Sequence, residues 1–187
     1  TDESKCRGNK IVFFIKNIKH SKEILGLQEL ELDTQQDNRG QIWPLYSKYD
    51  FLPDFVEDKI SISTKDVLRG LHGDADTDKL ITCLHGKIQL AVIDLRKHSE
   101  TYLNCQTFIL DEEVPRSVFV PKGCVNGHLC LSEKCIFYYK WSKKYLGAEK
   151  QITIKYNDKS ANIKWLTDNP ILSDRDRSGI KLEGVYL

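Results

Sequence analysis

Long apolar runs are missing from this chain of 187 residues. No stretch approaches the roughly 20 consecutive apolar residues that a membrane-spanning helix requires. The longest apolar stretch near the start, Ile11 to Ile15, is too short for the core of a signal peptide. The sequence therefore predicts a cytoplasmic protein with no membrane partner.

A strong charge of either sign is also missing. The chain carries 28 basic and 27 acidic residues, for a formal net charge of +1. A basic field that attracts a phosphate backbone is a usual mark of proteins that bind nucleic acid. We therefore expect no nucleic-acid partner.

Several motifs for metals and nucleotides are absent. The six cysteines form no C-x-x-C pair, and no histidine lies at zinc-finger spacing from them. Buried reduced thiols are the favoured interpretation. His72, His85 and His128 are isolated from one another, so no pair at i, i+2 predicts the metal site of a metal-binding barrel. No glycine-rich loop opens a helix, which argues against a bound dinucleotide.

Alternation of apolar and polar residues dominates what is present. It predicts many short strands separated by turns, and hence an all-β sandwich or barrel formed by one domain over residues 1–187. The first twenty residues resemble an added strand, Lys10 to Lys16, of the kind that often pairs with a neighbouring subunit. The predicted strands are 59–64, 80–84, 87–94, 106–110, 117–120, 128–131, 135–141 and 151–156, and the possible short helices are 47–52, 64–67 and 173–179.

The segment Val67-Leu68-Arg69-Gly70-Leu71-His72-Gly73-Asp74, followed by Lys79, holds the most informative group of side chains. An arginine binds phosphate, a histidine accepts a proton near neutral pH, and a lysine stabilises a developing negative charge. A lone histidine is more often structural than catalytic. Three such residues within eleven positions favour proton abstraction next to a carbonyl on a phosphorylated substrate.

Three further positions carry candidate side chains. The segment Asn126-Gly127-His128 follows a turn, and Tyr139 lies in a predicted strand in which aromatic residues usually pack. Asp158 is a carboxylate that could orient a histidine, although Asn157-Asp158 is also ordinary turn composition.

The order of motifs resembles the dTDP-4-dehydrorhamnose 3,5-epimerase family from about residue 35 to residue 176. Proteins of this family are jelly-roll cupins that act as dimers without a metal or organic cofactor, and the resemblance implies the same here. The motifs that carry it are Asp37-Asn38-Arg39-Gly40, Val67-Leu68-Arg69-Gly70-Leu71-His72, Lys79-Leu80, Asp94-Leu95-Arg96-Lys97 with Ser99 and Thr101, Val120-Pro121-Lys122-Gly123, Leu131-Ser132 and Tyr139-Lys140.

The resemblance also implies roles. His72 matches the general base and Asp158 the carboxylate that partners it. Lys79 matches the lysine near the sugar's 4-keto oxygen, and Tyr139 matches the general acid. The expected substrate-binding residues are Arg39, Arg69, Ser63, Asn126 and His128.

Two departures from the family pattern bear on the substrate. The segment between His72 and Lys79 is about three residues shorter than in the rhamnose enzymes, and Asn126-Gly127-His128 replaces the usual His-Gly-Phe. Both features resemble a bacterial branch that acts on GDP-4-keto-6-deoxy-heptoses in capsule or surface-polysaccharide synthesis. We therefore predict a nucleotide-diphospho-4-keto-6-deoxy-sugar 3,5- or 3-epimerase, with a GDP-heptose as the expected substrate.

Two other functions remain open at this stage. A 3,4-ketoisomerase of nucleotide-linked sugars needs two bases on one face, and His128 could be the second. A cupin that binds a sugar nucleotide without catalysis is the other, although it has no need of a base with an opposed acid.

Overall fold

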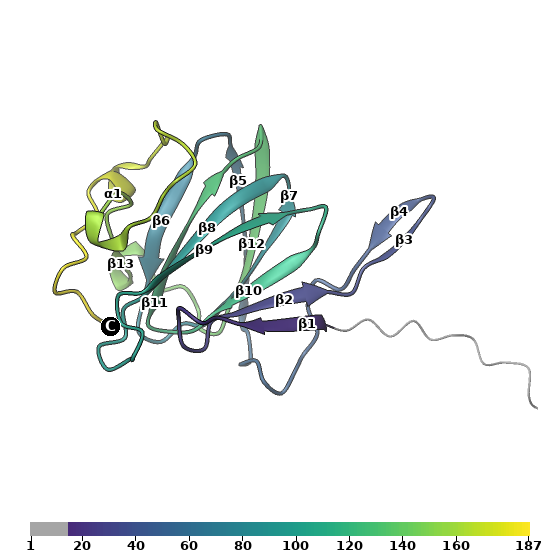
Figure 1. Ribbon diagram of the computed structural model, residues 1–187, viewed down its shortest axis with the longest axis horizontal. Helices are drawn as coiled ribbons and strands as arrows, with labels where there is room; N and C mark the ends of the chain where they lie inside the picture. The colour runs from purple at the N-terminus through teal and green to yellow at the C-terminus, as the bar shows by residue number, and fades with distance from the viewer. Residues whose placement is uncertain (1–14) are drawn as a thin grey trace, which may run out of the picture.

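The computed structural model describes residues 15–187, which form two packed antiparallel sheets and a projecting hairpin (Figure 1). The larger sheet has the order β1 (Ile15–His20), β2 (Gln28–Leu32), β10 (Arg116–Val120), β7 (Lys79–His85), β12 (Lys134–Trp141), β5 (Glu57–Thr64). The smaller sheet has the order β13 (Ile152–Thr153), β6 (Leu68–Gly73), β11 (Cys124–Cys130), β8 (Lys87–Asp94), β9 (Cys105–Asp111). This arrangement confirms the predicted all-β jelly roll.

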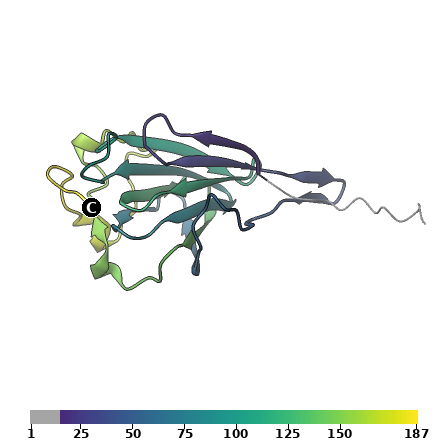
Figure 2. The same ribbon diagram turned by 90° about the horizontal axis from the view of Figure 1, so that it is seen from below.

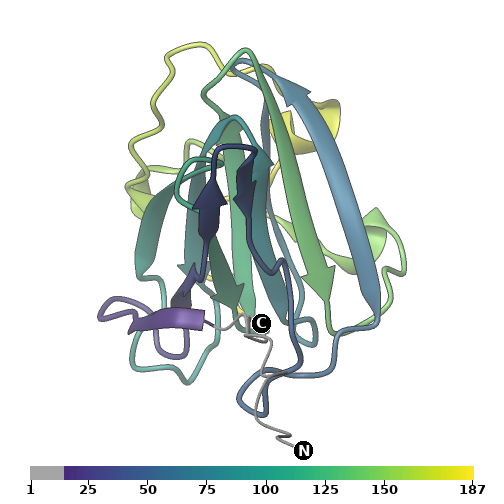
Figure 3. The same cartoon turned by 90° about the vertical axis from the view of Figure 1, so that its right-hand side faces the viewer.

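The hairpin of β3 (Gln35–Asp37) and β4 (Gly40–Ile42) extends away from the two sheets. Figure 2 shows it projecting beyond the ends of the other strands, and Figure 3 shows it in front of the two sheets. All six of its strand residues are exposed. Its turn lies within Asp37-Asn38-Arg39-Gly40, one of the motifs that carry the resemblance to the epimerase family.

The space between the sheets is filled by apolar side chains that alternate along the strands. Strand β12 directs Phe137 into this core, together with Ile88, Leu90 and Val92 from β8. The residues between them on β8 are buried as well, because the segment after β13 covers the outer face of the smaller sheet. Burial of both faces explains why β8 is nearly continuous in apolar residues.

Several sequence predictions need correction. The segments 47–52 and 64–67 are turns rather than helices, and only Asp174–Arg177 (α1) of 173–179 is an α-helix. Two further short helical turns lie at Ala148–Lys150 and Lys159–Ala161. Strands β2, β3, β4 and β6 were not predicted, and only Ile152–Thr153 (β13) of the predicted strand 151–156 is a strand. Residues 10–14 of the predicted N-terminal strand lie outside the described residues, and β1 begins at Ile15.

His85-Gly86 is a hairpin signal in the sequence, but β7 and β8 on either side of it belong to different sheets and do not pair with each other. The hairpin interpretation is therefore wrong, and His85-Gly86 is a turn that leads from one sheet to the other. Cys83, Cys105, Cys124, Cys130 and Cys135 are free thiols, as expected. In residues 15–187 no helix is long and apolar enough to cross a membrane.

Candidate active site

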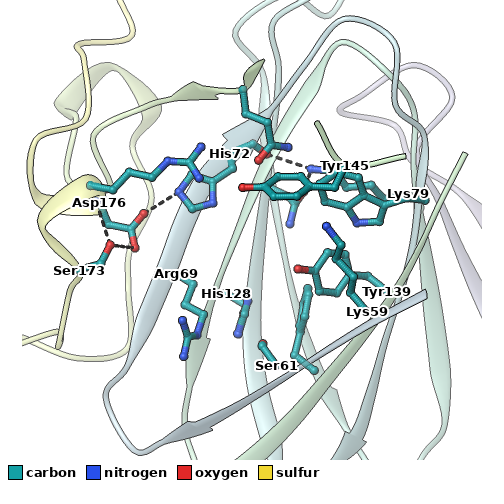
Figure 4. Close-up of a pocket in the computed structure, with 15 residues that line it drawn as sticks. Lys59, Ser61, Arg69, His72, Lys79, His128, Tyr139, Tyr145, Ser173 and Asp176 are labelled. Atoms are coloured by element: carbon teal, nitrogen blue, oxygen red, sulfur yellow. Dashed lines mark hydrogen bonds and ion pairs between the residues drawn. The ribbon is translucent and has the colours of Figure 1, made fainter. Parts of the chain in front are cut away.

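A pocket of about 360 Å³ opens between the two sheets (Figure 4). The larger sheet contributes residues from β5, β7 and β12, and the smaller sheet contributes residues from β6 and β11. The segment around α1 closes one side. The lining residues that carry polar or ionisable groups are Lys59, Ser61, Arg69, His72, Lys79, Asn126, His128, Tyr139, Trp141, Tyr145, Gln151, Ser173, Arg175 and Asp176.

His72 is paired with Asp176, and both residues line the pocket. The Nε2 atom of His72 lies 2.6 Å from Oδ1 of Asp176, which is almost fully buried. Asp176 is fixed in turn by the hydroxyl of Ser173, which donates to Oδ2 at 2.8 Å. A carboxylate holds the proton of a histidine on the nitrogen that faces it, so the lone pair of neutral His72 is on Nδ1.

Asp176 stays ionised in this position. Burial alone would raise the pKa of its carboxyl, but hydrogen bonds from His72 and Ser173 outweigh burial and lower the pKa. The pair therefore consists of an anionic carboxylate and an oriented imidazole, which is the usual arrangement of a histidine general base.

The prediction that Asp158 partners His72 is wrong. Asp158 caps the helical turn that follows it, accepting hydrogen bonds from the backbone N–H of Ser160 at 2.8 Å and of Leu182 at 3.0 Å. Its turn interpretation, which the sequence also allowed, is the one that the structure supports. The carboxylate that faces His72 is Asp176, in the short helix α1 of the C-terminal segment.

Lys79 is buried on β7 with no carboxylate bound to it among residues 15–187. Its ammonium donates to Oδ1 of Asn126 at 2.8 Å and to the backbone carbonyl of His72 at 3.1 Å. Burial lowers the pKa of Lys79 to about 8. The side chain is therefore a desolvated cation next to the proposed base.

Tyr139 enters the pocket from the opposite sheet to His72. Its ring lies between those of Phe137 and Trp141 on β12, with ring centroids 5.0 and 5.7 Å away. Burial raises the pKa of its hydroxyl, so Tyr139 is protonated at neutral pH. Period-two alternation turns Tyr138 to the outer face, where its hydroxyl donates to Asp58.

His128 lies deeper, stacked on Phe137 with ring centroids 3.9 Å apart. Burial, together with the charges of Arg69 and His72, lowers the pKa of His128 to about 3. The ring is therefore neutral at physiological pH. It lines the same pocket as Asn126, two positions before it on β11.

The remaining predicted binding residues differ in position. Arg69 lines the pocket, and its Nε donates to the hydroxyl of Ser63 at 3.1 Å. Ser63 itself is buried beside the pocket, and Ser61 is the serine of β5 that lines it. Arg39 lies outside this pocket, in the turn of the β3–β4 hairpin, paired with Asp37 and 86% exposed.

The sequence did not identify Lys59, Trp141, Arg175 or Asp176 as pocket residues. Serine is a common N-cap residue, so Ser173 was a local signal for the start of a helix near Asp176. In the structure its hydroxyl accepts from the backbone N–H of Asp176 at the start of α1. His72 and Asp176 are 104 positions apart in the sequence, so their contact could not be predicted from it. In residues 15–187 no group of three or more histidine, cysteine or acidic side chains is placed to hold a metal ion.

Comparison with known proteins identifies relatives along most of the chain. The dTDP-4-dehydrorhamnose 3,5-epimerase of Shigella flexneri is 37% identical over 131 residues, covering 68% of this chain and 72% of that protein. The protein of the same name from Methanothermobacter thermautotrophicus is 33% identical over 170 residues, covering 84% and 91%.

A solved structure agrees with these relatives. The dTDP-6-deoxy-D-glucose-3,5-epimerase of Legionella pneumophila, crystallised with dTDP-4-keto-L-rhamnose, superposes with a TM-score of 0.82 at 30% identity. The match covers 87% of this chain and 90% of that one. The sequence profile of the dTDP-4-dehydrorhamnose 3,5-epimerase family matches residues 21–184. The chain is therefore a member of the dTDP-4-dehydrorhamnose 3,5-epimerase family, an enzyme of the isomerase class.

Proposed function

We propose that the protein epimerises a dTDP-linked 4-keto-6-deoxy sugar at one or both carbons next to the ketone. The observation that carries the proposal is the His72–Asp176 pair at 2.6 Å in one pocket with Lys79 and Tyr139. A base, a cation and an acid around one cavity are the groups that enolisation of a ketone and reprotonation need.

The reaction begins with His72. Its neutral imidazole takes the proton from C3 or C5, and the electrons of the C–H bond move to the 4-keto oxygen. Asp176 stabilises the imidazolium that forms. General base catalysis of this kind contributes roughly 10²–10⁴-fold to a rate.

Lys79 stabilises the oxygen of the enolate, because its ammonium is buried and is not neutralised by a bound carboxylate. Tyr139 then gives its proton to the same carbon from the other side. The two sheets support this geometry, since His72 comes from the smaller sheet and Tyr139 from the larger. Reprotonation from the opposite face inverts the carbon.

The charges of the pocket suit a diphosphate. Its lining includes four basic side chains, Lys59, Arg69, Lys79 and Arg175, against one carboxylate, Asp176. The Nζ atom of Lys59 lies over the Tyr145 ring, 3.5 Å from its centroid, and so covers one face of that ring. Charge-assisted hydrogen bonds from arginine and lysine are among the strongest contacts with phosphate.

The choice of nucleotide rests on the relatives, which are named for dTDP sugars. The GDP-heptose expected from the short His72–Lys79 segment has no support among them, and neither does a specific role in capsule synthesis. Thermal unfolding with dTDP, GDP, UDP and CDP tests this point. The preferred diphosphate raises the unfolding temperature most; a larger shift with GDP would contradict the dTDP assignment.

A homodimer belongs to the same proposal. Arg39 does not line this pocket, and its hairpin projects away from the two sheets (Figure 2), so we expect its contact with substrate to be made in the pocket of a second copy. A projecting arm with an exposed arginine suits the phosphates of a substrate bound in the partner subunit.

Incubation with dTDP-4-keto-6-deoxy-D-glucose in D₂O tests the activity. The proposal predicts deuterium at C3, C5 or both, and NMR spectra of an inverted 4-keto product. A 3-keto product would identify a 3,4-ketoisomerase instead. Binding without exchange would identify a non-catalytic cupin.

A further inference from the structure

Asn126 holds a fixed orientation next to Lys79. The ammonium of Lys79 has three N–H donors and no acceptor, so the Asn126 atom 2.8 Å from it is the carbonyl oxygen Oδ1. The amide nitrogen Nδ2 is therefore the other arm of the side chain. The contact with Lys79 decides which way the amide points.

The amide nitrogen has no other task within residues 15–187. Asn126 is 9% exposed and lines the pocket, and Nδ2 makes no hydrogen bond to any described group. Lys79 uses two of its protons, on Asn126 and on the carbonyl of His72. One ammonium N–H and the two amide N–H groups remain available at the same wall of the cavity.

The two side chains reach each other from opposite sheets. Lys79 is the first residue of β7, and Asn126 is in the middle of β11, paired with His72 on β6. The position of Asn126 directly across from His72 places its amide beside the proposed base. His72, Lys79 and Asn126 line the same pocket, as a base and two donors to a neighbouring oxygen must.

We propose that Asn126 is a catalytic residue whose amide N–H donates to the enolate oxygen, forming with Lys79 a two-residue oxyanion site. This inference rests on the proposed epimerisation and adds a second donor to it. Negative charge develops on that oxygen as the C–H bond breaks, so a donor fixed beforehand stabilises the transition state more than the ketone.

A neutral partner also suits Lys79. Asn126 anchors the ammonium without adding a negative charge, so the positive charge of Lys79 is not neutralised and can stabilise the substrate oxygen. Loss of one oxyanion donor typically lowers the turnover number about 10²–10³-fold.

Asn126→Asp separates anchoring from donation. The aspartate keeps an oxygen for Lys79 and lacks the amide protons. The proposal predicts that the turnover number for exchange of substrate C–H into D₂O falls about 10²–10³-fold, with a small change in KM. An ionised aspartate also raises the pKa of Lys79, so the decline of activity at high pH moves upward while the maximum rate falls.

Asn126→Ala is the matched variant, because it removes the amide protons without introducing a carboxylate. It is expected to lose turnover by at least the same factor. Wild-type turnover in Asn126→Asp would overturn the proposal, because anchoring of Lys79 by an oxygen would then be sufficient for catalysis. Wild-type turnover in Asn126→Ala would overturn it as well, because any loss in Asn126→Asp would then come from the added negative charge and not from the missing amide protons. Stabilisation of both variants by dTDP verifies that they are folded. Absence of exchange in the wild-type protein would instead refute the epimerase function itself.

Discussion

At the scale of single residues, the site depends on which carboxylate faces His72. Asp176 bonds the imidazole, whereas Asp158 bonds two backbone amides. Both residues are aspartates near the C-terminal end of the chain, so their substitutions form a matched pair.

We expect Asp176→Asn to lower the rate of substrate deuterium exchange by about 10⁴-fold, because an amide can hold His72 in the wrong tautomer. Asp158→Asn should leave exchange near the wild-type rate and affect stability only. Exchange rates measured by NMR decide between them. Equal losses in the two variants would contradict the assignment of Asp176.

The role proposed for Lys79 predicts that activity has an alkaline limit. Burial lowers the pKa of its ammonium to about 8, and only the protonated form stabilises an enolate. Activity should therefore decline as the pH rises through about 8. A profile of kcat/KM against pH checks this, since it reports groups of the free enzyme. A constant rate up to pH 10 would show that the charge of Lys79 is not required.

At the scale of elements, the motif Asp94-Leu95-Arg96-Lys97 with Ser99 and Thr101 forms the loop between β8 and β9, and the structure shows what it does. Asp94 is fully buried and accepts hydrogen bonds from Arg96, Ser99 and Thr101. The motif that helped to relate the chain to its family therefore shapes a loop and does not enter the pocket.

Asp94→Asn should destabilise the fold by about 1.5–3 kcal/mol, because an amide replaces the charged acceptor of these hydrogen bonds. Burial would raise the pKa of Asp94, but these hydrogen bonds lower it to about 2. A lowered pKa means that the stabilisation is present above the unfolded value near 3.8 and is lost as the pH falls through about 2.

Urea unfolding at neutral pH measures the loss, with Ser99→Ala as a milder control that removes one donor. A difference below 1 kcal/mol in Asp94→Asn would mean that the loop holds its shape without the carboxylate.

The strands differ in how well the sequence pattern predicted them. Alternation identified β5, and a nearly continuous apolar run identified β8, whose two faces are both buried. Neither pattern identified β6, in which Arg69, Gly70 and His72 interrupt the apolar pattern. The proposed site residues of β6 are therefore the ones that obscure its strand pattern in the sequence.

At the scale of the whole molecule, the site is assembled from distant segments. Arg69, His72 and Lys79 were predictable because they lie close together in sequence. Asp176 and Arg175 were not, since the C-terminal segment reaches the pocket only after it has covered the smaller sheet. Spacing along the chain carries no information about such a contact.

The predicted dimer has a direct test. If Arg39 serves the partner's pocket, His72→Ala and Arg39→Ala are each impaired, and mixed dimers contain one site with both residues intact. Unfolding and refolding an equal mixture should recover about a quarter of wild-type activity. A mixture no more active than its components would show that Arg39 acts in its own subunit or not at all.

Exchange of substrate hydrogen for solvent deuterium tests the central claim most directly, because it separates proton removal from inversion. With dTDP-4-keto-6-deoxy-D-glucose, His72→Ala should lose exchange at both C3 and C5. Tyr139→Phe should still exchange, with retention of configuration and no inverted product. Exchange at the wild-type rate in His72→Ala, or equal loss of exchange and inversion in Tyr139→Phe, would contradict a histidine base opposed by a tyrosine acid.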